Sequence, residues 1–205
     1  MRIGFIGSGK IGGTLARLLS GARHEVMVSN SRGPETLSGL VEELGPKAQA
    51  GTAAEAAAFG DVVVVSIPFG RYPDLPAQEL RGKVVVDTGN YYAQRDGTFP
   101  AGFGTSSEAV AAHLDGARVV KAFNSIRWDH LRDKGRPSGS GGRLAIPIAG
   151  DDDAAKQVVA SLIDEIGFDA VDHGTLADGA RQEPGTPVYG VLLTAEQARE
   201  QLAAS

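Results

Sequence analysis

The feature that most constrains this 205-residue chain is a glycine-rich turn placed directly after its first apolar run. Residues 2–6 (RIGFI) are typical of a short buried strand, and GSGKIG follows with Gly7, Gly9 and Gly12 in the spacing G-x-G-x-x-G. The first glycine permits a tight turn from strand to helix, the second lets a pyrophosphate approach the backbone, and the third allows close helix–strand packing. The pattern predicts a strand–turn–helix unit that binds a dinucleotide.

Short apolar runs alternate with helical patterns along the rest of the chain. Several of these runs are continuously apolar, as expected for parallel strands covered on both faces. We therefore expect an α/β fold of the Rossmann type, with a doubly wound, mostly parallel sheet and helices on both faces. The predicted strands are 2–6, 24–28, 48–50, 62–67, 83–87, 117–123, 143–149 and 168–172; the predicted helices are 11–20, 34–44, 52–59, 73–80, 106–114, 152–166 and 194–203.

The domain organisation follows from where this alternation is interrupted. Residues 133–143 (DKGRPSGSGGR) are rich in Gly, Ser and charged residues, which predicts either a mobile loop or the border of a small C-terminal subregion. Strand and helix patterns resume directly after it, so we expect a single dinucleotide-binding domain of the Rossmann type over residues 1–205. Residues 175–205 are expected to form a C-terminal extension that packs on this domain.

Composition limits the classes of function. The net charge of −5 and the pI of about 5.4 do not suggest a nucleic-acid partner. There is no cysteine, which excludes disulfides, thiolate metal sites and a cysteine nucleophile, but leaves the redox compartment undetermined. No apolar run approaches the roughly 20 residues of a membrane helix. We expect a cytoplasmic location and no membrane partner.

The end of the second predicted strand indicates which dinucleotide is bound. Asn30-Ser31-Arg32 follows the apolar run HEVMV and begins 23 residues after Gly7, where a ribose-binding Asp or Glu is usual. No acid occurs between Glu25 and Glu35. A guanidinium, a hydroxyl and an amide suit a 2′-phosphate, so the segment favours NADP over NAD. The alternative is an ordinary polar loop with a solvated arginine.

Several motifs in the same order resemble a known family. Besides the glycine turn and Asn30–Arg32, they are VVVVSIP (62–68), VVDTGNYY (84–92) and ARVVKAFN (117–124). With them the chain resembles the F420-dependent NADP oxidoreductase family, and it is similar to the oxidoreductase domain of the six-transmembrane metalloreductases. The resemblance implies hydride transfer between NADP(H) and a flavin-like acceptor, with the deazaflavin coenzyme F420 as the first candidate. Two alternatives remain: an NADPH-dependent flavin or ferric-chelate reductase, and a non-catalytic NADP(H)-binding sensor or regulatory module.

The resemblance also assigns roles to residues. Hydride transfer between cofactors depends on their positioning, so no catalytic side chain is expected. Asn124, a polar residue at a strand end, is expected to bond the nicotinamide carboxamide. In all, Gly7, Ser8, Gly9, Lys10, Ile11 and Gly12 are assigned to the pyrophosphate turn, Asn30, Ser31 and Arg32 to the 2′-phosphate, Ser66, Ile67 and Pro68 to the channel between adenine and nicotinamide, and Asn90, Ala122 and Asn124 to the nicotinamide side.

The acceptor side is less well defined. Coenzyme F420 has an acidic tail. Residues 127–143 carry five basic residues and two acidic ones, which predicts a positively charged surface that attracts this tail. A solvated charged loop is the alternative. Trp128 lies in this segment and either stacks on a flavin-like ring or anchors the loop to the core. Tyr91 and Tyr92 either wall the nicotinamide pocket or pack beneath a loop.

Two further expectations concern metals and assembly. The four histidines (His24, His113, His130 and His173) show no metal-ligand spacing, so no metal site is expected. The resemblance implies a homodimer, because family members often dimerise and a chain of this size leaves a shallow acceptor site.

Overall fold

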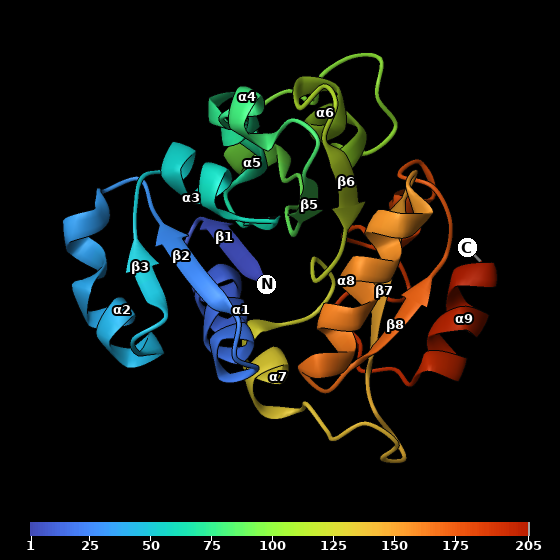
Figure 1. Cartoon of the computed structure of the whole chain (residues 1–205). Helices are drawn as coiled ribbons and strands as arrows, with labels where there is room; N and C mark the ends of the chain where they lie inside the picture. The colour runs from blue at the N-terminus through green and yellow to red at the C-terminus, as the bar shows by residue number, and fades with distance from the viewer. Residues whose placement is uncertain (205) are drawn as a thin grey trace.

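The computed structural model describes residues 1–204 and contains an eight-stranded sheet in the order β3-β2-β1-β4-β5-β6-β7-β8. Neighbouring strands are parallel except β6 and β7, which are antiparallel. The predicted Rossmann-type class is confirmed, and α2 with β3 lies at one edge and α9 at the other (Figure 1). The strands are β1 (Arg2–Ile6), β2 (Glu25–Ser29), β3 (Ala48–Ala50), β4 (Val62–Val65), β5 (Val84–Asp87), β6 (Arg118–Lys121), β7 (Ala145–Gly150) and β8 (Asp169–Asp172).

Most helices lie where the sequence predicts them. Two predicted helices are each divided into two shorter elements, and three short helical elements were not predicted. The predicted helix 34–44 is a 3₁₀ turn followed by an α-helix, and the pattern at 73–80 covers only the end of one 3₁₀ turn and a short helix. The elements α5, α7 and η3 were not predicted. The helices are α1 (Lys10–Gly21), η1 (Pro34–Leu37), α2 (Ser38–Leu44), α3 (Ala53–Phe59), η2 (Phe69–Asp74), α4 (Ala77–Leu80), α5 (Ala93–Asp96), α6 (Ser106–His113), α7 (Trp128–Asp133), α8 (Asp153–Glu165), η3 (Asp178–Gln182) and α9 (Ala195–Ala203).

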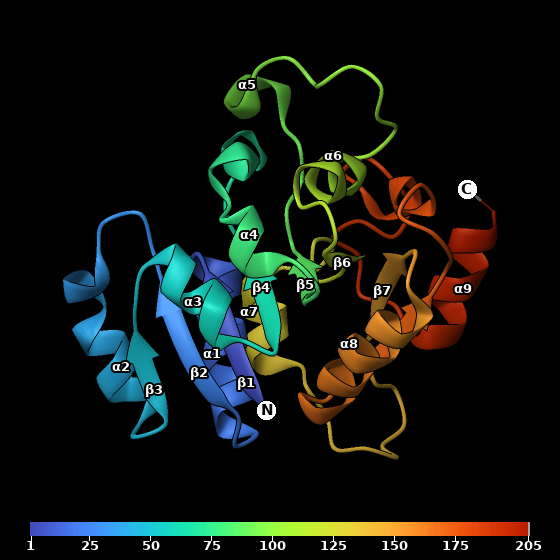
Figure 2. The ribbon, with the colours of Figure 1, turned by 45° about the horizontal axis from the view of Figure 1, so that its top comes forward.

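The continuously apolar strands are buried on both faces. In β4, Val62 and Val64 pack in a core cluster with α1, α7 and α8, whereas Val63 and Val65 pack in a second cluster with α3, η2, α4 and α6. Figure 2 shows α3 and α4 on one side of the sheet and α1 and α7 on the other. Because successive side chains of a strand point to opposite faces, an all-valine strand satisfies both layers at once. Within residues 1–204, no helix combines the length and apolar character needed to cross a membrane.

Helix α3, which lies within the predicted helix 52–59, begins with a capping box. The backbone N–H of Glu55 donates to Oγ1 of Thr52 at 3.2 Å, and the backbone N–H of Thr52 donates to the Glu55 carboxylate at 2.8 Å. This exchange satisfies two N–H groups that the helix leaves free. It holds α3 in place, and the backbone of α3 then packs on β1 so closely that a Cβ at Gly4 would lie 2.0 Å from the Ala56 carbonyl oxygen.

An aromatic cluster and one buried carboxylate hold the loop that contains α5. Tyr91 packs against Phe69 and Phe99, with ring centroids 5.7 and 5.0 Å away, so it packs beneath a loop, the second of its two predicted roles. Asp96, with 1% of its side chain exposed, pairs with Arg95 and accepts the backbone N–H of Gly70 at 3.1 Å. This carboxylate therefore fastens α5 to η2.

Asp96 gives a test of how much this loop contributes to stability. Hydrogen bonding from Arg95 holds the pKa of Asp96 at about 2, below the ordinary 3.8. A lowered carboxyl pKa stabilises the fold above roughly pH 4, and that stabilisation is lost as the pH falls toward the folded-state value. We expect Asp96→Asn to lower the free energy of unfolding at pH 7 by about 1–2 kcal/mol.

The measurement is urea unfolding of both proteins between pH 7 and pH 2. The difference between wild type and variant should shrink as the pH falls below roughly 4. Asp115→Asn, which changes a carboxylate that is 82% exposed, is the control and should leave the unfolding free energy nearly unchanged. A difference for Asp96→Asn that stayed constant down to pH 2 would contradict this account.

Candidate dinucleotide-binding site

A cavity of about 470 Å³ lies where β1, β2 and β4 end. Because these strands are parallel and adjacent, their carboxyl ends meet at the same edge of the sheet, where dinucleotides bind in open α/β folds. The cavity volume is in the range of small-molecule sites. Much of the predicted site lines it: Gly7, Ser8, Gly9, Asn30, Ser31, Arg32, Ser66, Ile67 and Pro68.

The three glycines of the turn differ in what surrounds them, as the motif predicts. Gly7 has a φ of +100°, and a Cβ there would lie 2.3 Å from the Ser66 carbonyl oxygen. A Cβ at Gly12 would lie 2.0 Å from the Gly7 carbonyl oxygen. A Cβ at Gly9 would meet nothing within 4 Å. Gly7 and Gly12 are therefore required by the protein's own packing, whereas Gly9 faces open space of the kind that a pyrophosphate needs.

The first turn of α1 supplies hydrogen-bond donors to that space. The helix begins at Lys10, no side chain caps its N-terminus, and its first turn contains no acid. The leading N–H groups of a helix attract anions, so the N–H groups of Lys10 and Ile11 suit a pyrophosphate. The Lys10 side chain extends toward α7, with its Nζ 5.6 Å from the centre of the Trp128 ring. Neither Lys10 nor Ile11 lines the cavity with its side chain.

The loop after β2 separates the predicted roles of Asn30, Ser31 and Arg32. The Asn30 amide donates to Oγ1 of Thr36 at 2.9 Å, and its oxygen accepts the backbone N–H of Arg32 at 2.9 Å. Asn30 therefore shapes the loop, with one of its two amide N–H groups engaged by Thr36. The side chains of Ser31 and Arg32 are exposed and make no hydrogen bond or ion pair in the described part of the chain. They are the groups of this loop that can bind a 2′-phosphate.

The structure adds residues that the sequence patterns did not single out. Arg71, Asp74 and Leu75 line the cavity from η2 and the residue that follows it, and Ala53 lines it from the start of α3. The one available signal was a basic residue three positions after Pro68, on the loop that follows a site-forming strand. The helical pattern that begins at 73 obscured it.

The predicted nicotinamide side is closed by protein hydrogen bonds. The Asn124 amide donates to Oδ1 of Asn90 at 2.9 Å and to the Gln182 carbonyl at 2.8 Å, and its oxygen accepts from the Gln182 amide at 2.6 Å. Both N–H groups of the Asn124 amide are therefore engaged, and its oxygen already accepts one hydrogen bond. Ala122 is 0% exposed and cannot contact a ligand here. Ala122 lies in the core cluster with α1, α7 and α8, whereas Asn124 is bonded to Gln182 of the C-terminal segment.

Phe123 lies between these two residues in an unusual backbone conformation. Its φ is +62°, and it is 3% exposed. A left-handed conformation costs a residue other than glycine of the order of 1–2 kcal/mol, so the surrounding packing must impose it. Strained residues of this kind are common at functional sites. Here the conformation of Phe123 changes the direction of the chain after β6.

A buried ion cluster reinforces the ends of β5 and β6. Lys121 is 0% exposed, and its Nζ lies 3.2 Å from a Glu183 carboxylate oxygen, 3.0 Å from Oγ of Ser106 and 3.1 Å from Oγ of Ser107. Ser107 in turn donates to Asp87 at 2.6 Å. Removing one partner from such a cluster leaves a buried charge uncompensated, so we infer that it fixes the C-terminal segment against the strand ends.

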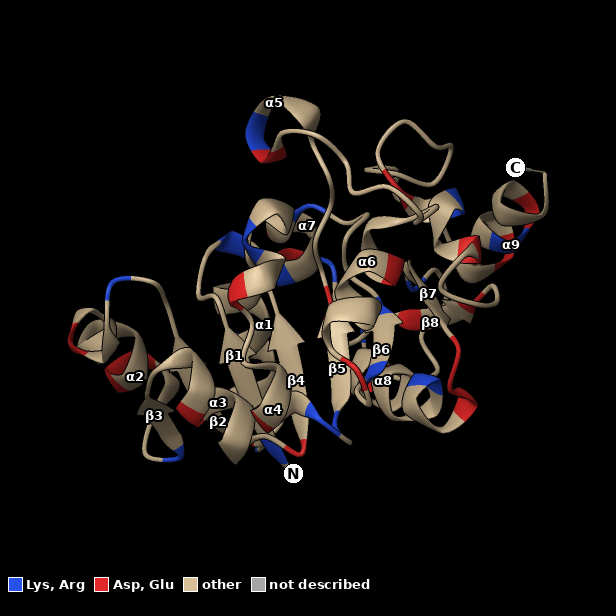
Figure 3. Ribbon diagram, turned by 90° about the horizontal axis from the view of Figure 1, so that it is seen from above, with Lys and Arg blue, Asp and Glu red and all other residues tan. Residues whose placement is uncertain are grey.

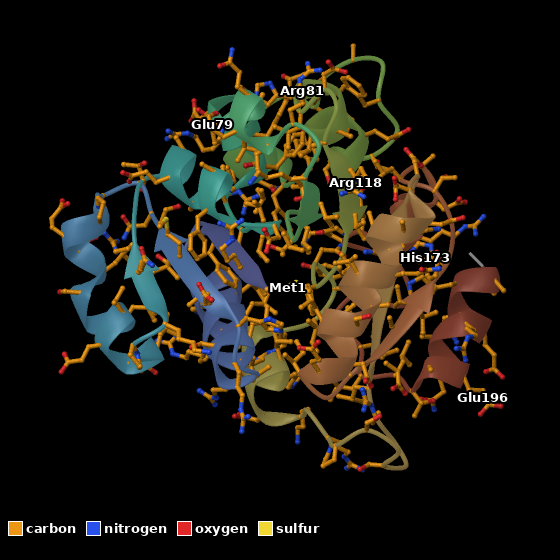
Figure 4. The ribbon with its side chains drawn as sticks, viewed as in Figure 1. Met1, Glu79, Arg81, Arg118, His173 and Glu196 are labelled. Carbon is orange, nitrogen blue, oxygen red and sulfur yellow. The ribbon has the colours of Figure 1, made fainter. Side chains whose placement is uncertain are left out.

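His173 belongs to the same covering segment and is remote from the cavity. It lies beside α8 in the C-terminal part of the molecule (Figure 4), with its ring 2.5 Å from the Gln182 amide oxygen. Burial lowers the pKa of His173 below its ordinary value, which favours the neutral ring. This supports a structural role. Within residues 1–204, His, Asp and Glu side chains form no group suited to a metal ion.

The basic segment is less positive than the sequence count suggests. Arg127 pairs with Asp129 at 2.7 Å, Arg132 pairs with Asp133 at 2.6 Å, and Arg143 is buried between two acids of α8 and β8. Blue and red segments are interspersed over the ribbon in Figure 3. Asp129 and Asp133 already belong to the sequence count, so the excess is reduced by the outside acids that pair with Arg143, while Lys134 and Arg136 have no acidic partner among the described residues.

Trp128 is half-buried at the start of α7. Besides Lys10, the guanidinium carbon of Arg132 lies 5.1 Å from its ring centre. The ring contacts are with the protein's own cations, and α7 packs on α1. This favours the anchoring role.

Fold and site together define a Rossmann-type dinucleotide-binding protein. Comparison with known families then gives a narrower class: residues 2–91 match the family described as NADP oxidoreductase, coenzyme F420-dependent. Over these residues the chain is similar to the F420-dependent NADP oxidoreductase family, as the sequence motifs indicate.

Individual relatives agree with this assignment. The metalloreductase STEAP3 of Rattus norvegicus is 31% identical over 91% of this chain and 36% of its own length. The structure of a hypothetical protein, SMa0349 of Sinorhizobium meliloti, is 31% identical with a TM-score of 0.81 and 95% of both chains covered. A candidate F420-dependent NADP reductase of Arthrobacter sp. FB24 is 25% identical with a TM-score of 0.76, over 95% of this chain and 99% of that one. The chain spans between 36% and 59% of the length of the first curated relatives it matches.

The glycine turn allows a matched pair of substitutions. We expect Gly9→Ala to leave stability nearly unchanged and to abolish measurable NADPH binding, because the added methyl enters open space needed by the pyrophosphate. We expect Gly12→Ala to destabilise the protein, because a contact of 2.0 Å with a backbone oxygen outweighs the gain in helix propensity of about 1 kcal/mol.

Thermal unfolding and calorimetric titration with NADPH separate the two effects. Gly39→Ala is the control, since a Cβ there also meets nothing within 4 Å and the residue lies outside the cavity. Gly9→Ala with full NADPH affinity would show that the pyrophosphate does not lie at this turn.

Proposed function

We propose that this chain is an NADP-dependent oxidoreductase that transfers a hydride between NADP(H) and a flavin-like acceptor, the deazaflavin coenzyme F420 in the first instance. The observation that carries the NADP assignment is the pair of unpartnered side chains, Ser31 and Arg32, at the cavity edge opposite the glycine turn. A guanidinium without a competing carboxylate partner is suited to a 2′-phosphate.

The roles of the residues follow from their positions. Gly9 and the first N–H groups of α1 would hold the pyrophosphate, and Ser31 with Arg32 would hold the 2′-phosphate. Ser66, Ile67 and Pro68, at the end of β4, would line the path from adenosine toward the nicotinamide. The cofactors supply the hydride chemistry when bound, and the protein positions them and excludes water. No side chain is assigned a catalytic role.

The identity of the hydride acceptor is proposed from the relatives. The descriptions of the matched family and of the relative from Arthrobacter both name coenzyme F420, which supports F420 as the acceptor. A second candidate is an NADPH-dependent flavin or ferric-chelate reductase. It is supported by the metalloreductase relative, whose similarity extends over 91% of this chain, whereas the family match ends at residue 91. A sensor or regulatory module that binds NADP(H) without turnover is the third.

The proposal also covers oligomeric state, location and domain organisation. We infer a homodimer in the cytoplasm, with residues 1–205 as one NADP-binding domain and 175–205 as its packed extension. Support for the extension comes from the hydrogen bonds of Glu183 and Gln182 with Lys121 and Asn124, at and just after the end of β6.

Cofactor preference is tested at Arg32. We expect Arg32→Ala to weaken NADPH binding by about 1–3 kcal/mol, the scale of a charge-assisted hydrogen bond, and to leave NADH binding nearly unchanged. Calorimetric titration with both cofactors measures this. Arg23→Ala is the control, because Arg23 is also exposed but lies outside the cavity. Equal losses of affinity for NADPH and NADH would contradict the assignment of Arg32 to the 2′-phosphate.

The acceptor is tested by mixing the protein with NADPH and F420 and following the deazaflavin absorbance. We expect the absorbance to fall as F420 is reduced. NADPH oxidation with free flavin or ferric chelate but not with F420 would favour the second candidate. Tight NADPH binding with no turnover on any of these acceptors would favour the sensor.

A further inference from the structure

The cavity contains an ion pair that the roles assigned so far do not use. Arg71 and Asp74 line it from η2, and Nε of Arg71 donates to Oδ2 of Asp74. In a 3₁₀ turn, side chains three residues apart lie on the same side, which explains why the two meet. Phe69 fixes the turn by stacking on Tyr72 and Phe99, with ring centroids 5.0 and 5.8 Å apart. The pair is therefore held on a rigid element at the cavity wall.

The pair leaves both kinds of hydrogen-bonding group free. Only Nε of Arg71 and Oδ2 of Asp74 are engaged, so the two terminal nitrogens of the guanidinium and Oδ1 of the carboxylate have no partner in the described part of the chain. These nitrogens can only donate and this oxygen can only accept. The wall thus presents donors and an acceptor next to each other.

The charge of this wall makes it unsuited to a phosphate. Asp74 is the one acid among the described residues that line the cavity, and it neutralises Arg71. A 2′-phosphate placed here would be repelled by the Asp74 carboxylate, whereas Arg32 carries no such partner. The neighbouring lining is apolar and includes Ile67, Pro68 and the buried Leu75. An apolar surface edged by one donor and one acceptor suits a neutral, flat heterocycle.

We propose that Arg71 and Asp74 recognise the adenine base of NADP(H). Adenine carries an amine donor beside ring-nitrogen acceptors. Oδ1 of Asp74 accepts from the amine, a terminal nitrogen of Arg71 donates to a ring nitrogen, and Ile67, Pro68 and Leu75 contact the ring. This assignment rests on the proposed NADP(H) function. It differs from the role of Arg32, because adenine is common to NADPH and NADH.

The test uses the charge-neutral double variant Arg71→Ala/Asp74→Ala and calorimetric titration with NADPH and NADH. We expect both affinities to fall by the same factor, roughly tenfold, as for loss of a pair of hydrogen bonds. The matched control is Arg81→Ala/Asp115→Ala, an exposed pair 2.8 Å apart near the beginnings of β5 and β6, at the opposite edge of the sheet (Arg81 is labelled in Figure 4). The control should bind both cofactors as wild type does.

The single variant Asp74→Ala tests the amine contact. Wild type should prefer NADPH over its hypoxanthine analogue, in which a carbonyl oxygen replaces the amine, and Asp74→Ala should lose that preference. Thermal unfolding checks that each variant is folded.

The possible failures are distinguishable. A double variant that weakens NADPH alone would place the 2′-phosphate at Arg71, and unchanged binding of both cofactors would show that the pair does not touch them. Equal binding of the two base analogues by wild type would overturn the amine assignment. Failure of the NADP(H) function itself would appear as no binding of either cofactor by wild type, or as equal losses in Arg32→Ala.

Discussion

The close contact between the start of α1 and the turn that precedes it is the constraint on which the site depends. A Cβ at Gly12 would lie 2.0 Å from the Gly7 carbonyl oxygen, and one at Gly7 would lie 2.3 Å from that of Ser66. Backbone therefore packs on backbone where β1, α1 and β4 meet. This contact aims the free N–H groups of α1 at the space beside Gly9, and it brings the end of β4 next to the turn. The cavity exists because nothing larger than hydrogen occupies these positions.

The two halves of the sheet edge are built differently. Beside β1, β2 and β4 the edge is open, and exposed side chains such as Arg32 and Arg71 line a cavity. Beside β5 and β6 it is closed by buried polar contacts, with Lys121 and Asn124 bonded to residues 182–183. A buried lysine is tolerated only with partners close by, so this half is held rigid. The open half suits a ligand that binds from solvent, and the closed half sets how far that ligand can extend.

Particular elements show what could be predicted from the sequence. The valine runs of β4 and β5 predicted buried parallel strands because only a strand covered on both faces tolerates such a run. The predicted helix 52–59 agrees with α3, because the capping box of Thr52 and Glu55 that starts this helix is local. The division of residues 34–44 into η1 and α2, and the short α7, were not predicted. Propensity is weak in segments this short, and packing against α1 decides their form.

The sequence by itself determined the glycine turn, the order of strands and helices, and the absence of an acid after β2, because each depends on residues close together in the chain. These features were enough to predict a Rossmann-type fold and to favour NADP. Only the tertiary structure decided which predicted side chains remain free. Asn30 and Asn124 are bonded to Thr36 and Gln182, Arg127, Arg132 and Arg143 are paired with acids, and Arg71 lines the cavity with Asp74. A polar side chain can bind a ligand only through donors and acceptors that the fold leaves free, and contacts such as the one between Asn124 and Gln182 form only when distant parts of the chain meet.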